Sequence, residues 1–382
     1  MQPAGIYSSA ALLWPALVAA EAGRLTSDLA QDLASLAAGT APGSEVGSLR
    51  WATRNLVVIE LPTMRLRDFS TDREGVPVLI CAPFALHGAN IADFAHRHSL
   101  VETLIAEGIH HLLVTDWRSA TAEMCFFSID TYLADLNVAV DQVGGKVDMI
   151  GICQGGWMAL IYAARFPQKV RRLVIAGAPV DLAVQSDISI AAKTVWLSVF
   201  KDLVVLGHGR VLGQRMLPLW GWRDLDSAAI REILQMRGEP KSRPAKANEA
   251  RFRAWNATTV DLPGTYYLEV VQWIFRENRL AEGRLLALGQ RVDLAAICQP
   301  IFLLAARDDE FVAPGQVINT TGLIHTADRD RREAVVAGSH LSLFMGRETL
   351  SNTWPRIAAW LRAKSPPRRS RHRAPGAASP TA

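Results

Sequence analysis

The sequence contains few cysteines for its length, and no two of them have the spacing of a metal site. Four occur in 382 residues, at positions 81, 125, 153 and 298. Cysteines this scattered do not form a disulfide framework, and without a C-x-x-C pair there is no indication of zinc. We therefore expect a chain that works in a reducing cytoplasm and binds no metal.

The sequence also lacks a long apolar run. None approaches the roughly 20 residues that span a bilayer, so no transmembrane segment is expected. The apolar stretch near the N-terminus is interrupted by Pro15 and follows no basic residue, which argues against a signal peptide. Residues 1–45 are expected to form a helical segment, amphipathic over about 8–38, followed by a linker.

Excess charge is absent from the body of the chain. The net charge is +4, but residues 362–382 contribute six basic side chains and no acid, and without those six the remainder has a net charge of −2. The sequence therefore predicts a basic, disordered tail over 362–382 and no nucleic-acid-binding face.

Strand-like and helix-like segments alternate over residues 46–361, which predicts an α/β domain whose mostly parallel sheet is flanked by helices. The strand-like segments are 56–61 and 64–69, which read as a hairpin, and 77–82, 111–115, 147–152, 172–177, 300–305 and 332–337. Helical spacing occurs over 99–107, 129–143, 155–166 and 348–361. The rhythm breaks over about 183–292, which is rich in aromatic residues and predicts a mainly helical cap inserted before the strand at 300–305.

The most informative motif joins the strand at 147–152 to the helix that follows it. It reads Gly151-Ile152-Cys153-Gln154-Gly155-Gly156. This is the G-x-nucleophile-x-G pattern of a nucleophile elbow, with cysteine where the lipase pattern has serine. A thiolate at the start of a helix is favoured by the helix dipole, so we expect Cys153 to be an acyl-accepting nucleophile.

A thiol nucleophile requires a base, and the base requires an orienting acid. In this type of sheet the expected order is nucleophile, acid, histidine, each in a loop after a strand. Asp309 follows the strand at 300–305 and His340 follows the strand at 332–337. Asp308 competes with Asp309 for the role of the acid, and the spacing to Pro314 favours Asp309.

An oxyanion formed during acyl transfer requires two backbone N–H donors. The first is expected at Gln154, directly after the nucleophile. The second is expected in the loop after the strand at 77–82, at Phe84 or Ala85. His87, in the same loop, is expected to shape the loop rather than to transfer protons.

These motifs resemble the polyhydroxyalkanoate synthases, most closely the short class III subunit. The elbow carries the resemblance together with residues 169–174 (KVRRLV), 178–181 (APVD), 115–117 (TDW) and 128–132 (SIDTY). The resemblance covers about residues 50–361 and implies an α/β-hydrolase fold with Cys153, Asp309 and His340 as a triad. It implies polymerisation of 3-hydroxyacyl groups from coenzyme A thioesters, which are the substrate, and no cofactor.

The same resemblance implies a cytoplasmic enzyme at polymer granules that acts with a second synthase subunit or as a homodimer. Two departures keep other functions open. Asp309 is followed by Glu310-Phe311-Val312 rather than by the D-H-I-V-P-W type segment of synthases. The loop at 338–347 is similar to that of intracellular polyhydroxybutyrate depolymerases, so a cysteine-dependent hydrolase is the alternative. A granule-associated scaffold without activity is the third hypothesis.

Overall fold

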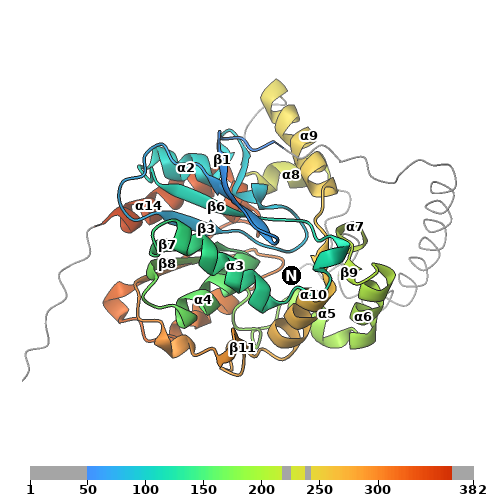
Figure 1. Cartoon of the computed structure of the whole chain (residues 1–382). Helices are drawn as coiled ribbons and strands as arrows, with labels where there is room; N and C mark the ends of the chain where they lie inside the picture. Colours follow the sequence, from blue (N-terminus) through green and yellow to red (C-terminus); the bar gives the residue numbers. More distant parts are fainter. Residues whose placement is uncertain (1–49, 217–224, 237–241, 364–382) are drawn as a thin grey trace, which may run out of the picture.

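A computed structural model describes residues 50–216, 225–236 and 242–363 of the chain (Figure 1). The expected N-terminal segment over 1–45 and nearly all of the basic tail over 362–382 therefore lie outside the described residues.

Within these ranges, eight strands form one sheet in the order β1-β2-β6-β3-β7-β8-β13-β14. Strands from β6 to β14 run parallel, whereas β2 pairs antiparallel with both β1 and β6. The pairing of β1 with β2 confirms the predicted hairpin. The strands are β1 (Leu56–Glu60), β2 (Met64–Asp68), β3 (Val78–Cys81), β6 (Leu112–Trp117), β7 (Val147–Ile152), β8 (Val170–Ala176), β13 (Ile301–Ala306) and β14 (Arg331–Val336).

Three short antiparallel pairs lie outside this sheet: β4 (Asp93–Ala95) with β5 (His98–Ser99), β9 (Arg210–Val211) with β10 (Leu262–Pro263), and β11 (Leu286–Ala287) with β12 (Gln290–Arg291).

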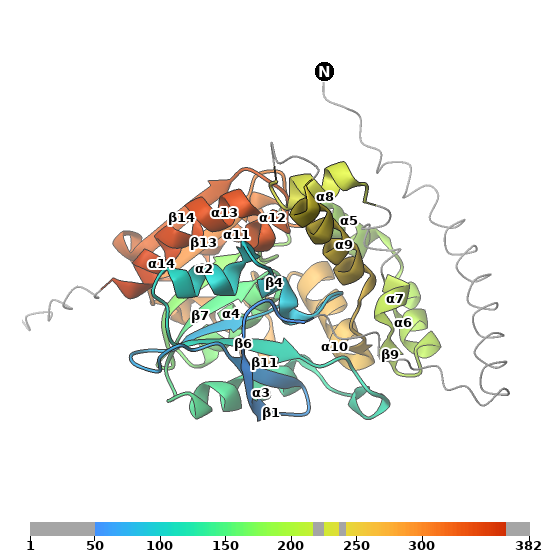
Figure 2. The same cartoon turned by 90° about the horizontal axis from the view of Figure 1, so that it is seen from above.

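Helices cover both faces of the large sheet (Figures 1 and 2). On one face lie α3 (Ile129–Gln142) and α4 (Gln154–Arg165). On the other lie α2 (Leu100–Ala106), α12 (Ser342–Met345), α13 (Arg347–Asn352) and α14 (Trp354–Arg362). Single turns occur at α11 (Pro314–Ile318), η1 (Ala89–Ala92), η2 (Ala122–Met124), η4 (Leu294–Ala296), η5 (Asn319–Gly322) and η6 (Asp328–Asp330).

The central strand β7 shows why these helices are needed on both faces. Every one of its residues is buried. Successive side chains of a strand point to opposite faces, so Met149 packs into the core beside α4, whereas Ile150 and Ile152 pack into the core on the α14 side. A strand that is apolar throughout is stable only when both faces of its sheet are covered.

The prediction of one final helix over 348–361 is wrong, because the chain forms two helices there. α13 ends at Asn352 and α14 begins at Trp354, with Pro355 in its first turn. A proline inside a helix removes a backbone donor and clashes with the preceding turn, whereas at the first turn it is tolerated. The break also lets the indole N–H of Trp354 donate to the Leu343 carbonyl at 2.7 Å.

The segment between β8 and β13 is mainly helical and lies over the end of the sheet that carries the elbow (Figure 1). Its helices are α5 (Asp187–Thr194), α6 (Leu197–Leu206), α7 (Gly213–Met216), α8 (Ser227–Ile233), α9 (Arg243–Ala257) and α10 (Gly264–Glu269), which runs directly into a π-helix, η3 (Val270–Arg276). We call the segment between β8 and β13 the cap. Across the described ranges, no helix is long and apolar enough to cross a membrane.

Candidate active site

The turn between β7 and α4 places a thiol on a strained backbone. Cys153 has φ 51° and ψ −129°, a conformation that non-glycine residues rarely adopt. A Cβ added at Gly155 would lie 2.0 Å from the Cys81 carbonyl oxygen, and one at Gly151 would lie 2.5 Å from the Gly156 Cα. The glycines of the motif are therefore required by close backbone packing, and the strain at Cys153 is held in place by that packing.

The structure brings His340 and Asp309 together and leaves Asp308 apart. His340 Nδ1 lies 2.7 Å from Asp309 Oδ2, and both side chains are almost fully buried. The other Asp309 oxygen accepts from the N–H groups of Phe311 at 2.9 Å and Val312 at 2.8 Å. Asp308 is exposed. Of the two aspartates that the sequence offered as the acid, it is Asp309 that contacts the His340 ring.

The charges around the imidazole favour its protonated form. Burial by itself would lower the pKa of His340, but the negative charges and hydrogen bonds of Asp309 and Cys153 outweigh it and hold that pKa well above its ordinary value. Phe311 and Phe344 contact the His340 ring edge to face, with centroids 5.7 and 5.6 Å away. The ring is therefore fixed on its sides by aromatic packing and at Nδ1 by a carboxylate.

A cavity of about 160 Å³ opens against Cys153, Gln154 and His340. Apart from these groups, its walls are mostly apolar side chains of the cap, among them Ile188, Ala192, Met216, Val270, Val271 and Phe275. Apolar walls around a few convergent polar groups are typical of a small-molecule site. A lining of this kind suits an aliphatic group next to the thiol.

Two of the three expected oxyanion donors border this cavity. Among the described residues, no hydrogen bond engages the backbone N–H of Gln154, Phe84 or Ala85. Gln154 and Ala85 line the cavity, whereas Phe84 is fully buried beneath it, with its ring 4.7 Å from Tyr132. The placement favours Ala85 over Phe84 as the second donor.

His87 joins the loop after β3 to the cap. Its Nδ1 lies 3.0 Å from the Thr258 carbonyl oxygen, and its ring lies 4.2 Å from the Trp255 ring. Burial lowers the pKa of His87 to about 4, although the Thr258 carbonyl acts in the opposite direction. A neutral, tethered imidazole agrees with the expected role in shaping the loop.

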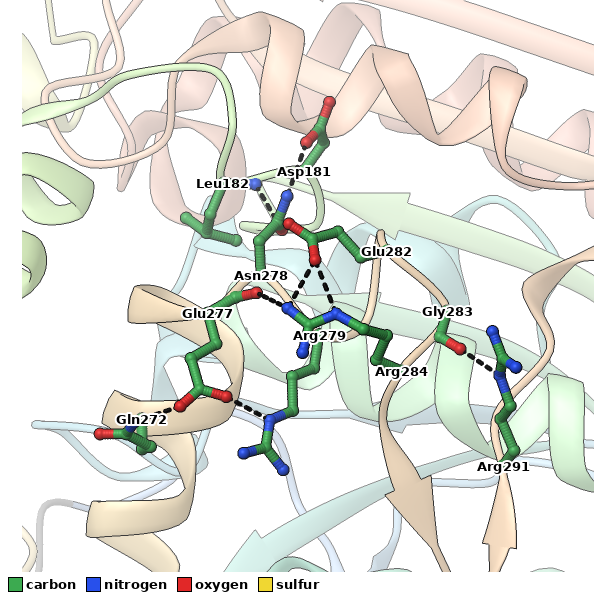
Figure 3. A network of polar contacts seen from close by, with 10 residues as sticks. All are labelled: Asp181, Leu182, Gln272, Glu277, Asn278, Arg279, Glu282, Gly283, Arg284 and Arg291. Atoms are coloured by element: carbon green, nitrogen blue, oxygen red, sulfur yellow. Dashed lines mark hydrogen bonds and ion pairs between the residues drawn. The ribbon is translucent and has the colours of Figure 1, made fainter.

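The π-helix η3 presents Val270, Val271 and Phe275 to the cavity, and polar contacts fasten its C-terminal end (Figure 3). Asn278 Nδ2 donates to Asp181 Oδ1 at 3.1 Å, and Asn278 Oδ1 accepts from the N–H of Leu182 at 2.9 Å. Residues 181 and 182 directly follow the core segment that leaves β8. These two bonds therefore hold the cavity wall to the sheet.

Sequence reasoning missed two groups near the site. Glu310 Oε2 accepts from the backbone N–H of His340 at 3.1 Å, and Tyr267 lines the cavity. Because Glu310 directly follows the expected acid Asp309, its position in the sequence could have indicated that it lies near His340. The cap is rich in aromatic residues, and nothing in the sequence distinguishes Tyr267 from the others.

Solved structures show which fold class the chain has. A monoacylglycerol lipase from Paleococcus ferrophilus matches 78% of this chain and 98% of its own, at 16% identity and a TM-score of 0.50. An epoxide hydrolase from Bacillus megaterium matches 81% of this chain and 99% of its own, at 15% identity and a TM-score of 0.51. The chain has the α/β-hydrolase fold.

Within that class, sequence similarity relates the chain to the poly(3-hydroxyalkanoate) polymerase family. The PhaC subunit of Haloferax mediterranei is 23% identical over 82% of this chain, which spans 64% of that protein's length. The PhaC subunits of Allochromatium vinosum and Synechocystis are each 26% identical over 75% of this chain, and the matches span 81% and 77% of their lengths. Residues 229–365 match the family described as PHB de-polymerase C-terminus.

Proposed function

We propose that this chain is an acyltransferase that polymerises 3-hydroxyacyl groups from coenzyme A thioesters through an acyl-cysteine intermediate. The observation that carries the proposal is a thiol on a strained elbow, beside a buried imidazole–carboxylate pair, at the wall of an apolar cavity. The polymerase names of its relatives support the substrate class.

In the first half-reaction, His340 takes the thiol proton and the sulfur of Cys153 attacks the thioester carbonyl carbon. The backbone N–H groups of Gln154 and Ala85 stabilise the oxyanion. The bond between the carbonyl carbon and the coenzyme A sulfur breaks, and that sulfur takes the proton from His340. Asp309 holds the imidazole in orientation and stabilises its positive charge, as the acid does in serine hydrolase triads.

In the second half-reaction, the hydroxyl of another 3-hydroxyacyl thioester attacks the acyl group on Cys153. His340 takes the hydroxyl proton, an ester bond forms, and the carbon–sulfur bond to Cys153 breaks. The apolar walls of the cavity favour this outcome because they limit the access of water. The proposal includes a cytoplasmic location at polymer granules and action with a second subunit or as a homodimer of the class III type.

A cysteine-dependent hydrolase is the second candidate. One observation favours it: the family matched by residues 229–365 is named for depolymerases. In this alternative, water replaces the hydroxyl in the second half-reaction, and the product is a free hydroxy acid.

The test is incubation of the purified full chain with 3-hydroxybutyryl-coenzyme A, measuring free coenzyme A and insoluble polymer together. We expect coenzyme A release with polymer. Release with only free 3-hydroxybutyrate would replace the proposal by the hydrolase. Cys153→Ala should abolish release, whereas Cys298→Ala, which changes an exposed cysteine, should leave it intact. Turnover by Cys153→Ala would rule out the acyl-cysteine mechanism.

A further inference from the structure

Three consecutive acidic residues after β13 hold the loop that carries His340. Asp308 Oδ2 accepts from the N–H of Gly338 at 3.2 Å, Asp309 Oδ2 lies 2.7 Å from His340 Nδ1, and Glu310 Oε2 accepts from the N–H of His340 at 3.1 Å. Each acid therefore contacts a different atom of one short loop, and two of the three contact the same histidine.

The loop needs such anchors because it has little regular structure of its own. β14 ends at Val336, and Gly338 adopts φ 122°, in the region that favours glycine. α12 starts only at Ser342. The main chain around His340 is held by these carboxylates together with two other bonds: the Asp308 N–H donates to the Gly338 carbonyl at 3.2 Å, and the Gln235 amide donates to the Ala337 carbonyl at 3.3 Å.

Glu310 contacts the backbone of His340, whereas Asp309 contacts its ring. It does not line the cavity, so it cannot contact an acyl group there. Its side chain is partly buried. Burial raises the pKa of Glu310, while the positive charge of His340 and the His340 N–H act in the opposite direction. A carboxylate in this place fixes the backbone of the base and adds a second negative charge beside its ring.

We propose that Glu310 is a positioning residue: it fixes the main chain of His340 and stabilises the imidazolium that pairs with the Cys153 thiolate. Among the described residues, His340 and Asp309 are the charged groups that act on Glu310. The effect on turnover rests on the proposed acyl transfer, whereas the effect on the thiolate–imidazolium pair does not.

Two substitutions separate the hydrogen bond from the charge. Glu310→Gln keeps an oxygen that can accept from the His340 N–H and removes the charge, and Glu310→Ala removes both. Glu333→Gln is the matched control, because it makes the same charge change at an exposed position on β14, the strand that leads into the loop. Circular dichroism and the unfolding midpoint establish that each variant is folded.

The primary measurement is the rate of Cys153 alkylation by iodoacetamide from pH 5 to 9, about two units to either side of neutrality. The tryptic peptide 147–165 carries Cys153 and no other cysteine, so mass spectrometry reads this site alone. We expect alkylation at neutral pH to slow about threefold in Glu310→Gln, which loses the charge, and about tenfold in Glu310→Ala, which loses the charge and the hydrogen bond. The tenfold change corresponds to about 1.36 kcal/mol. In both Glu310 variants, the pH at which the alkylation rate of Cys153 rises should be higher than in the wild-type chain.

Glu333→Gln should match the wild-type chain. Folded Glu310→Ala and Glu310→Gln variants that alkylate with the wild-type rate and pH profile would overturn the inference. With 3-hydroxybutyryl-coenzyme A as substrate, both variants should lower kcat and leave KM unchanged, because Glu310 does not line the cavity. A chain that never turns over this thioester, but whose alkylation follows Glu310 as expected, would overturn the proposed function and leave this inference standing.

Discussion

Replacement of Gly155 by alanine tests whether backbone packing holds the elbow. The added Cβ would lie 2.0 Å from the Cys81 carbonyl oxygen and 2.8 Å from that of Ala82. A relaxed carbon–oxygen contact is about 3.3 Å, so the shorter distance must open by about 1.3 Å. The obstacle is the main chain of β3, which pairs with β6 on one side and β7 on the other and cannot move alone.

Overpacking a close-packed interior costs about 1–3 kcal/mol, and an obstacle made of backbone places this change at the upper end, about 3 kcal/mol. Alanine offsets about 1 kcal/mol of this through its higher helix propensity. We therefore expect the free energy of unfolding to fall by about 2 kcal/mol. Because β3 leads directly into the loop of Ala85, a shift of about 1 Å there should also lower kcat about 100-fold.

Urea denaturation followed by circular dichroism measures the first effect, and coenzyme A release measures the second. Gly322→Ala is the control, because a Cβ at Gly322 would have no atom within 4 Å and the φ of this glycine lies outside the left-handed region. If Gly155→Ala were as stable and as active as Gly322→Ala, close packing under the elbow could not be the reason for the glycine.

Three further predictions concern the cap and the histidine. Asn278→Ala should lower the free energy of unfolding by about 2–3 kcal/mol in urea denaturation, because it removes the hydrogen bond to Asp181 and puts alanine at φ 49°. Asn278→Gly should be about 1 kcal/mol more stable than Asn278→Ala, because glycine adopts this φ without strain. Among the described residues the Tyr267 hydroxyl is buried without a hydrogen-bond partner, so Tyr267→Phe should leave the thermal midpoint equal or higher, and a clear drop would contradict this. The pKa of His340 is raised in the folded chain, so its pairing with Asp309 stabilises fully below about pH 6.5 and is lost as pH rises through the raised value. The difference in unfolding free energy between wild type and Asp309→Asn, measured in a urea series at several pH values, should therefore shrink toward alkaline pH.

The local parts of the fold and site could be predicted because their signals lie close together in the sequence. Glycines at 151, 155 and 156 around Cys153 encode a tight turn that few other structures need. The buried strands were recognisable from apolar runs bounded by turn residues. The order of Cys153, Asp309 and His340 indicated which loops to compare, since parallel strands end at the same edge of a sheet.

The features of the fold and site that the sequence could not predict depend on contacts between segments that are distant in sequence. The choice between Asp308 and Asp309 follows from the direction in which the chain turns after β13, which the backbone donors at 311 and 312 set. The bond between Asp181 and Asn278 joins positions 97 residues apart. The break before α14 was available in principle from Pro355, but the regular apolar spacing of 348–361 concealed it.

The π-helix in the cavity wall has a consequence for how this family of sequences can change. A π-turn holds one residue more than an α-turn, so it stores a single-residue insertion within an otherwise continuous helix. Loss of one residue from 270–276 would restore α geometry and rotate the two halves by about 100° relative to each other. Val271 and Phe275 could not then both keep their places in the wall. One codon deletion would reshape the cavity in a single evolutionary step, without any substitution at Cys153, Asp309 or His340.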